Sequence, residues 1–330
     1  MNDLSTILKC INKSVSPDEF RKGVLSAFLF QKQKNPVYNE FLAHMGKMEQ
    51  DVNEIFEIPF LPVSFFKNRK IIIEDKEAET IFRSSAITGS KPSEHHIAYI
   101  SLYQKSLNES FRFAFGKPSE YIFVALLPSY LERKDSSLVF MMNEMMEQSR
   151  NPLNGFYLNE LGKLAETLMF INENAQPCIF IGVSFALHTF AEKYPMVLND
   201  NIVVIETGGM KGRSNDISRT ALHENLCKAF GKSDIAGEYG MTELLSQSYS
   251  LSGGIYKAPP WVKVFARDLH DPLQTLGPGE SGALNVIDLA NIYSCPFIAT
   301  DDTGRVFEDG SFEVTGRVSD SDIRGCNLMV

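Results

Sequence analysis

The segment Glu238–Gln247 reads EYGMTELLSQ and combines side chains that together can bind a nucleotide. Tyr239 offers an aromatic face on which a purine can stack, and Gly240 lets a ligand approach the backbone closely. Thr242 offers a hydroxyl group to a phosphate, and Glu243 offers a carboxylate to Mg²⁺, which prefers oxygen ligands. The segment predicts a nucleotide and magnesium site, although one such run by itself is weak evidence.

Three further segments can complete such a site. Phe82–Ser93 (FRSSAITGSKPS) is rich in Ser, Thr and Gly and carries one Lys, so its N–H groups, hydroxyls and cation can bind phosphates. Ile205–Gly212 (IETGGMKG) reads as a strand that ends in two glycines, where a backbone can lie flat against a planar ring. Thr300–Arg317 carries Asp302, suited to ribose hydroxyls, and Arg317, suited to a phosphate. Each segment alone is most often a loop or a turn, but the four in this order predict ATP-dependent activation of a carboxylic acid.

The elements that must position these segments change in type along the chain. Residues 1 to about 60 read as helices, including 36–48, and the apolar run Ile71–Ile73 reads as a strand. From Tyr121 strands and helices alternate, which favours a largely parallel sheet flanked by helices. The expected strands there are 121–127, 178–183, 201–207 and 234–239, and the expected helices are 131–148, 158–174, 184–193 and 217–230. After Ser250 the pattern predicts short antiparallel strands at 261–266, 283–288, 304–309 and 311–316. The predicted fold class is α/β.

The composition narrows the class of protein. The 330 residues have 44% hydrophobic content and a net charge of −9, which favours a globular protein and argues against nucleic acid as the main partner. The N-terminus has no secretory pattern, and the longest apolar runs are too short to span a bilayer. The five cysteines are scattered and odd in number, so neither a disulfide framework nor a zinc site is expected, and a reducing cytoplasm fits best.

Longer stretches of the sequence resemble a known family. ETGGMKGR, the helix with ALHENL, EYGMTELLSQSYS and the final RGCNL look like the acyl-protein synthetase (LuxE) branch of the adenylate-forming, acyl-CoA synthetase superfamily. The resemblance runs from about Phe56 to the C-terminus. It implies the large-domain fold of adenylate-forming enzymes with the small C-terminal domain largely missing. We therefore expect a helical segment at 1–60 packed on a main domain at 61–330, of which 251–330 is an antiparallel subdomain with a truncated tail.

The resemblance also implies a role for each matching residue, with ATP and Mg²⁺ as cofactors. Thr242 would contact the α-phosphate, Glu243 would hold Mg²⁺, and Arg317 would touch the ribose or a phosphate. Asp302 would bind the ribose hydroxyls. The remaining positions are the phosphate loop (Ser84, Ser85, Thr88, Gly89 and Lys91) and the adenine site (Gly208, Gly209, Tyr239, Gly240 and Met241).

Cys326 is the expected acyl acceptor. It lies between Gly325 and Asn327, and Arg324 nearby favours a thiolate. In the family a cysteine near the C-terminus accepts the acyl group and passes it to a reductase. The implied activity is formation of an acyl-adenylate from a carboxylic acid, a long-chain fatty acid above all, followed by transfer to Cys326. A fatty-acyl reductase or a carrier protein is the implied partner.

Two other functions stay open from the residues. The family's phosphate loop reads Ser-Ser-Gly-Thr-Thr-Gly, and here Ala86 and Ile87 replace the inner Gly and the first Thr. A catalytically weak or inactive nucleotide-binding or acyl-binding module is therefore one alternative. The other is a serine hydrolase with Ser184 in a Gly-Val-Ser-Phe-Ala turn after a strand. Its candidate bases are His188 and His223, although no late acid-then-His order is evident. The pair His95-His96 lacks metal-ligand spacing, so no metal is expected there.

Overall fold

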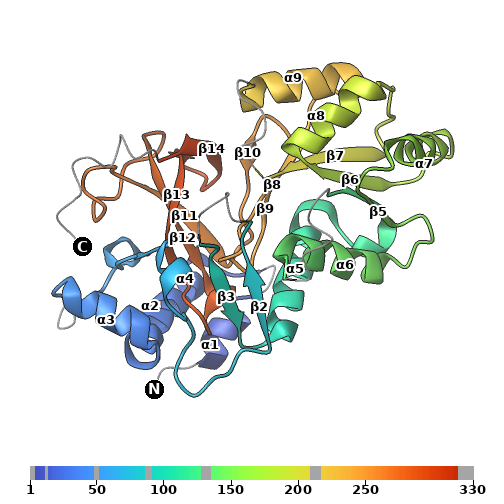
Figure 1. The fold of residues 1–330 in the computed structure, drawn as a ribbon. Coiled ribbons are helices and arrows are strands. Elements are labelled where there is room, and N and C mark those ends of the chain that lie inside the picture. Colours follow the sequence, from blue (N-terminus) through green and yellow to red (C-terminus); the bar gives the residue numbers. More distant parts are fainter. Residues whose placement is uncertain are drawn as a thin grey trace.

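The chain folds into two six-stranded sheets and a separate two-stranded hairpin, with helices around them (Figure 1). The structure is a computed structural model and describes residues 4–11, 14–47, 52–85, 91–127, 135–208 and 217–318. The predicted α/β class is confirmed: parallel strands alternate with helices in the middle of the chain, and antiparallel strands follow.

The first sheet is parallel except for its last strand, and its order is β5-β4-β6-β7-β8-β9. All residues of β4 and β6 are buried, as expected of parallel strands with both faces covered. Figure 1 shows α8 and α9 on one side of this sheet and α5 and α6 on the other. The strands are β4 (Ile122–Leu126), β5 (Gly155–Tyr157), β6 (Cys178–Val183), β7 (Ile202–Thr207), β8 (Ala236–Tyr239) and β9 (Ser248–Ser250). The helices are α5 (Ile100–Phe115), α6 (Ser137–Ser149), α7 (Leu161–Glu173), α8 (Ser184–Lys193) and α9 (Arg219–Phe230).

The second sheet is mainly antiparallel, in the order β10-β14-β13-β12-β11, and β1 pairs with β13 in parallel. A register shift between Thr303 and Gly304 interrupts the pairing of β13 with β14. Trp261, the only tryptophan, is fully buried just before β11. The elements are β1 (Leu61–Pro62), β10 (Ile255–Tyr256), β11 (Val262–Arg267), β12 (Ser281–Asp288), the 3₁₀ helix η3 (Leu289–Asn291), β13 (Phe297–Val306) and β14 (Phe312–Arg317).

The hairpin of β2 (Thr80–Arg83) and β3 (Glu94–Ile97) carries the candidate phosphate loop between its strands. The base of this loop is closed by two hydrogen bonds between Ser84 and Ser93. The Ser84 N–H donates to the Ser93 carbonyl (3.1 Å), and the Ser93 N–H donates to the Ser84 hydroxyl (2.9 Å).

The N-terminal helices pack on the second sheet. Ser16 and Glu19 form a capping box at the start of α2, which satisfies N–H groups that the helix leaves free. From the other end of α2, the buried side chains of Gln31 and Asn35 donate to the carbonyls of Ile292 and Ser294. The boundary at residue 60 stays a prediction. The elements of this part are α1 (Leu4–Lys9), α2 (Pro17–Lys34), α3 (Pro36–His44), α4 (Phe65–Asn68) and the 3₁₀ helices η1 (Ile55–Glu57) and η2 (Pro118–Glu120).

Some sequence-based expectations for single elements are wrong. Ile71–Ile73 is a coil and not a strand, although its three side chains are buried. The Ile73 N–H donates to the Tyr293 carbonyl, outside any strand ladder. The apolar run therefore reflects burial rather than pairing. The patterns also missed α5 and β5. Of the expected strand at 304–309, residues 304–306 are the end of the longer β13, and 307–309 lie in the turn before β14.

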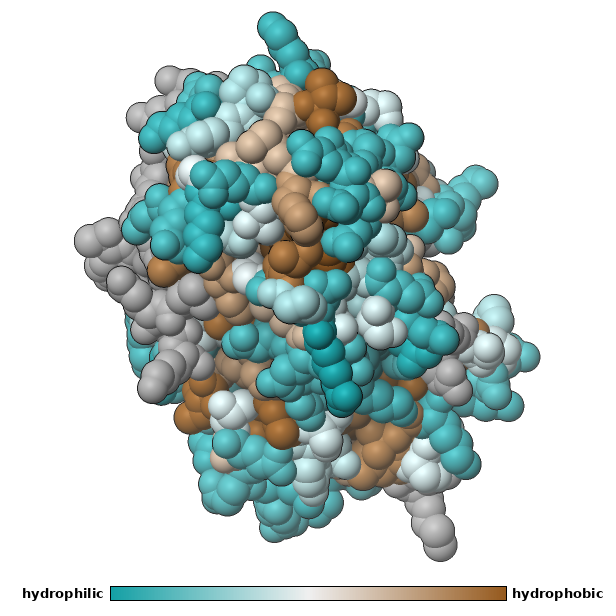
Figure 2. Space-filling model, turned by 90° about the vertical axis from the view of Figure 1, so that its right-hand side faces the viewer, coloured by the Kyte–Doolittle hydropathy of each residue, from teal (hydrophilic) through white to brown (hydrophobic). Residues whose placement is uncertain are grey.

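Of the helices in the described ranges, none combines the length and the hydrophobicity that a bilayer-spanning segment needs. The face in Figure 2 is largely hydrophilic, and its apolar residues form several small, separate groups.

Candidate functional site

Tyr239, Asp302 and Arg317 meet where the two large sheets approach each other. The Tyr239 hydroxyl donates to Oδ2 of Asp302 (3.0 Å), and Nε of Arg317 donates to Oδ1 (3.0 Å). Tyr239 ends β8 of the first sheet, while Asp302 and Arg317 are paired neighbours on β13 and β14 of the second. Residues from two of the four segments marked in the sequence therefore form one hydrogen-bonded group.

The aromatic ring of Tyr239 is held from within the protein. Its centroid lies 5.4 Å from that of Phe312 in an edge-on contact and 5.9 Å from that of Tyr256. Burial and the nearby charge of Asp302 raise the pKa of Tyr239 well above its usual value. The hydroxyl therefore stays protonated and donates a hydrogen bond to Asp302. Each oxygen of a carboxylate has two lone pairs, so Asp302 can still accept from another hydroxyl.

Thr242 and Glu243 lie in a coil between β8 and β9, close to this group. Glu243 is buried. Burial lowers the pKa of Arg317, but the charges of nearby carboxylates, Glu243 among them, together raise it above its usual value. Gly240 precedes them in a crowded place: a Cβ atom there would lie 2.5 Å from Oε1 of Glu238. An added Cβ would force the Glu238 carboxyl group to move, and that group is buried and bonded to Thr207.

The backbone of this coil is fastened by buried side chains from distant segments. Nδ1 of His95 lies 2.7 Å from the Thr242 carbonyl, and Nδ2 of Asn291 donates to the Glu243 carbonyl (2.7 Å). Asp288 accepts from the N–H groups of the next two peptides in the chain, those of Leu245 (2.9 Å) and Ser246 (3.0 Å), and from the Ser246 hydroxyl (2.7 Å). These three side chains were not marked as part of the site from the sequence; only His95 had been weighed, as a metal ligand.

The first glycine after β7 has a left-handed backbone conformation. Gly208 has φ = 69°, a value that residues with a Cβ rarely adopt. Its carbonyl accepts from the Ser184 hydroxyl (2.7 Å) at the start of α8. Gly209 lies outside the described residues.

The candidate phosphate loop is described only at its two ends. The Ser84 hydroxyl closes the base of the loop, and Ser85 and Lys91 lie beside the base. Thr88 and Gly89 lie outside the described residues, as do the two positions that depart from the family pattern, Ala86 and Ile87. Cys326 also falls outside.

A charged cluster, formed by Ser184, Glu206, Arg219 and His223, lies beside the glycine turn. Oε2 of Glu206 is 3.0 Å from Arg219 and 3.6 Å from Nε2 of His223, and Oε1 accepts from the Ser184 hydroxyl. Burial alone would raise the pKa of Glu206, but contacts with His223, Arg219 and Ser184 lower it. Ser184 thus bonds to a carboxylate and a carbonyl rather than to an imidazole, which argues against the serine hydrolase hypothesis.

Glu238 is a second buried carboxyl group, on the strand next to Glu206. Burial raises its pKa to about 7, against the effect of a hydrogen bond from Thr207. Glu206 and Glu238 lie near the ends of β7 and β8, which are neighbours in the sheet and consecutive in the sequence, so an acidic residue near the end of each of two consecutive strands was the available signal for this pair.

Metal binding by the protein alone has no support in the described ranges, where no group of three or more His, Cys, Asp or Glu side chains could hold an ion. Mg²⁺ usually uses one or two carboxylates together with substrate phosphates. A single buried carboxylate at Glu243 fits that mode of binding.

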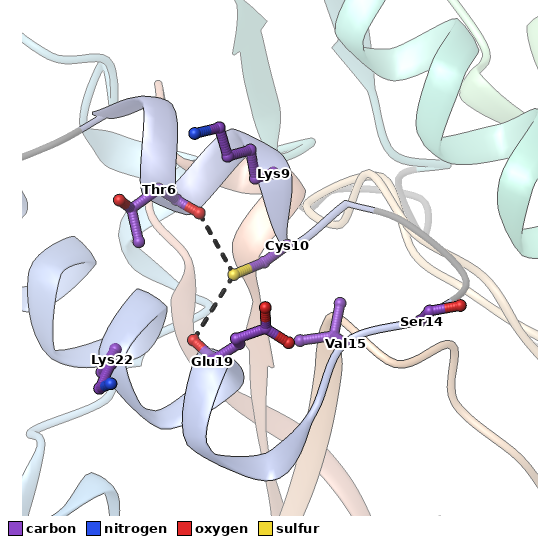
Figure 3. Close-up of a pocket in the computed structure, with 7 residues that line it drawn as sticks. All are labelled: Thr6, Lys9, Cys10, Ser14, Val15, Glu19 and Lys22. Carbon is purple, nitrogen blue, oxygen red and sulfur yellow. Dashed lines mark hydrogen bonds between the residues drawn. The ribbon is translucent and has the colours of Figure 1, made fainter.

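The cavity in Figure 3 lies elsewhere. It has a volume of about 240 Å³ between α1 and α2, and none of the candidate site residues lines it. Its thiol, that of Cys10, donates to the carbonyls of Thr6 and Glu19, and burial raises the pKa of that thiol. The lining residues are Thr6, Lys9, Cys10, Ser14, Val15, Glu19 and Lys22.

Two solved structures have a similar architecture. 2-Hydroxyisobutyryl-CoA ligase, in complex with 2-HIB-AMP and CoA, superposes with a TM-score of 0.66 at 12% identity, over 93% of this chain and 70% of that one. ATP-bound MatB from Rhodopseudomonas palustris gives a TM-score of 0.54 at 15% identity, over 73% of this chain and 48% of that one. The chain thus spans about half the length of MatB, and these likenesses establish the large-domain fold.

Two curated proteins are similar along nearly the whole sequence. Both are named long-chain-fatty-acid–luciferin-component ligase. The protein from Vibrio harveyi is 24% identical over 92% of this chain and 85% of its own length, and the protein from Aliivibrio fischeri is 23% identical over 93% and 86%. The family model for acyl-protein synthetase, LuxE, matches residues 131–330, which is more than half of the sequence. The chain belongs to the LuxE family of acyl-protein synthetases, enzymes of the adenylate-forming ligase type.

Proposed function

We propose that this protein activates a carboxylic acid with ATP and transfers the acyl group to a thiol. The observation that carries the proposal is the shared hydrogen bonding of Asp302 with Tyr239 and Arg317. An aromatic ring, a carboxylate and a guanidinium group lie together, and these are the groups that suit a purine, a ribose and a phosphate.

ATP would be held by the residues around this group. The adenine would lie between Tyr239 and the turn at Gly208 and Gly209, and the ribose hydroxyls would donate to Asp302. The Ser84–Lys91 loop would hold the outgoing phosphates. The positive φ of Gly208 and the closed base of the loop support these roles.

Glu243 would hold Mg²⁺ together with the phosphates of the nucleotide. When bound, Mg²⁺ offsets the negative charge that develops as pyrophosphate leaves. The buried carboxylate near Arg317 supports this assignment, because it places one anionic ligand next to a group suited to phosphate.

The reaction would proceed in two displacements. An oxygen of the substrate carboxylate attacks the α-phosphorus of ATP, which forms the acyl-adenylate and releases pyrophosphate. Thr242 would donate to an α-phosphate oxygen and Arg317 would offset its charge. A thiolate then attacks the acyl carbon, which forms a thioester and releases AMP. The names of the two curated relatives support a long-chain fatty acid as the substrate.

The thiol would be Cys326, and the acyl group would move on to a partner such as an acyl reductase or a carrier protein. The four cysteines in the described ranges are poor candidates. Cys10, Cys178 and Cys295 are buried, and burial raises the pKa of each thiol, for Cys295 to about 12. Burial and the charge of Asp234 raise that of Cys227.

Acid-dependent exchange of labelled pyrophosphate into ATP tests the first displacement. We expect exchange that requires a carboxylic acid, measured over a series from short acids to long-chain fatty acids. Nucleotide binding without exchange for every acid would refute the proposed function and favour the binding module instead.

Covalent labelling tests the acceptor. With radiolabelled fatty acid and ATP, we expect the wild-type chain to become labelled and Cys326→Ser to stay unlabelled while it still supports exchange. Cys227→Ser is the matched control and should label normally, because Cys227 is the one described cysteine that is not buried. Full labelling of Cys326→Ser would refute this role.

A further inference from the structure

We propose that His95 is a positioning residue that couples the phosphate-loop hairpin to the peptide of Thr242. The proposal rests on the proposed function, because Thr242 and Glu243 matter for catalysis only if the chain forms an adenylate. His95 lies in β3, two residues after the base of the loop at Ser93, and its Nδ1 lies 2.7 Å from the Thr242 carbonyl, 147 positions away in the sequence.

The coil that carries Thr242 depends on such contacts. It lies between β8 and β9 and takes part in no strand ladder. One turn bond, from the Leu244 N–H to the Met241 carbonyl (3.1 Å), is its own. The carbonyls of Thr242 and Glu243 instead bond to His95 and Asn291, so those two bonds orient the peptide groups of both residues.

The protonation of His95 is fixed by its surroundings. The ring is fully buried and meets Phe66 edge-on at 5.5 Å. Burial lowers its pKa to about 4, so the imidazole is neutral at working pH. A carbonyl can only accept, so Nδ1 carries the proton and Nε2 does not.

The other nitrogen of the ring has no hydrogen bond of ordinary geometry in the described part of the chain. Nε2 of His95 and Oδ1 of Asn291 are both buried, and within the described ranges they form no hydrogen bond of ordinary geometry, although the Asn291 side chain lies close enough to the ring to oppose the fall of its pKa. Leaving buried polar atoms unpaired is costly. A phenylalanine or leucine would avoid that cost in a purely structural role. The hydrogen bond from Nδ1 to the Thr242 carbonyl is the contact that an apolar side chain could not make.

Loss of that bond frees the Thr242 peptide without touching any substrate contact. A shift of about 1 Å in a catalytic group can lower the rate roughly 10²-fold. We expect His95→Leu to lower kcat of pyrophosphate exchange by about that factor with little change in KM for ATP. His95→Asn places an amide N–H near the position of Nδ1 and should stay within about threefold of the wild type.

Two controls separate positioning from loss of packing. His96→Asn changes the neighbouring residue, whose side chain points to the opposite face of β3, and should leave exchange unchanged. Phe66→Leu removes the ring contact on His95 but keeps its hydrogen bond, so it should lower the melting temperature more than kcat. All variants are assayed well below their melting temperatures. Equal losses for His95→Leu and His95→Asn, or no loss for His95→Leu, would overturn the proposal.

Amide hydrogen exchange provides a readout that does not require activity. Peptides that cover 241–247 should exchange faster in His95→Leu than in the wild type, and at the wild-type rate in His95→Asn and His96→Asn. If the wild-type chain shows no pyrophosphate exchange with any acid, the proposed function fails, and the amide exchange alone then decides the role of His95. Unchanged exchange of these peptides in His95→Leu would refute the coupling.

Discussion

Glu238 and His95 should act on the stability of the folded chain in opposite directions as the pH changes. Burial raises the pKa of Glu238 from 4.5 to about 7. Between these values the folded chain keeps a proton that the unfolded chain has lost, so the free energy of unfolding falls as the pH rises. Burial lowers the pKa of His95 from 6.5 to about 4. Between these two values the unfolded chain holds a proton that the folded chain has lost, so the free energy of unfolding rises as the pH rises.

The two effects are similar in size. Each pH unit between the folded and unfolded pKa values is worth about 1.4 kcal/mol, so each residue contributes a change of about 3 kcal/mol. The two windows overlap from about pH 4.5 to 6.5, and in the wild type the contributions largely cancel there. Glu206 does not interfere, because its lowered pKa places its effect below pH 4.5.

Single substitutions should separate the two contributions to the pH dependence of the free energy of unfolding. For Glu238→Gln, the free energy of unfolding relative to the wild type should increase by about 2 to 3 kcal/mol between pH 5 and 7. For His95→Asn it should decrease by about 2 kcal/mol between pH 5 and 6.5. Urea unfolding followed by the fluorescence of Trp261 measures this directly, because that buried indole donates to Ser246 within the same part of the fold.

The double variant is the control. With both groups removed, its difference from the wild type should be nearly independent of pH between 5 and 6.5. The reasoning is refuted if the Glu238→Gln difference stays constant within about 0.5 kcal/mol over the whole range, because Glu238 would then titrate alike in the folded and unfolded chains.

Three further substitutions test the coil that carries the candidate site. Gly240→Ala should impair exchange activity, since its Cβ would lie 2.5 Å from Glu238 Oε1, and the added change Glu238→Ala should restore part of it; no recovery would contradict the steric cause. Asp288→Asn should lower the free energy of unfolding by about 2 kcal/mol, because an amide NH₂ would face N–H donors, measured by Trp261 fluorescence in urea. Glu243→Gln should slow pyrophosphate exchange roughly 10²-fold with unchanged stability, and full activity would exclude its role with Mg²⁺.

The sequence allowed the type of fold and several site residues to be predicted, but not the contacts between them. Tyr239, Asp302 and Arg317 could be marked because their residue types suit a nucleotide. Their meeting depends on how two sheets dock, which no local pattern encodes. Ile71–Ile73 was predicted as a strand because burial and pairing leave the same apolar signal.

The role of His95 had no local signal either. A histidine pair after a loop is read first as a possible metal site, and only the fold brings this ring to a carbonyl 147 residues away. Asp288 and Asn291 were hidden for the same reason, since each sits next to an ordinary strand end and contacts the coil from outside.

These distant contacts also bear on how the protein folds. The coil at 240–247 is bound to partners 147, 48 and 42 positions away in the sequence. Contacts of such length close only after the intervening chain has collapsed, and topologies rich in them fold slowly. The segment that carries the candidate chemistry should therefore be among the last to acquire its native shape. A nascent chain that has not yet added β12 and η3 would contain the complete EYGMTE motif but lack the side chains of these elements that bind its backbone.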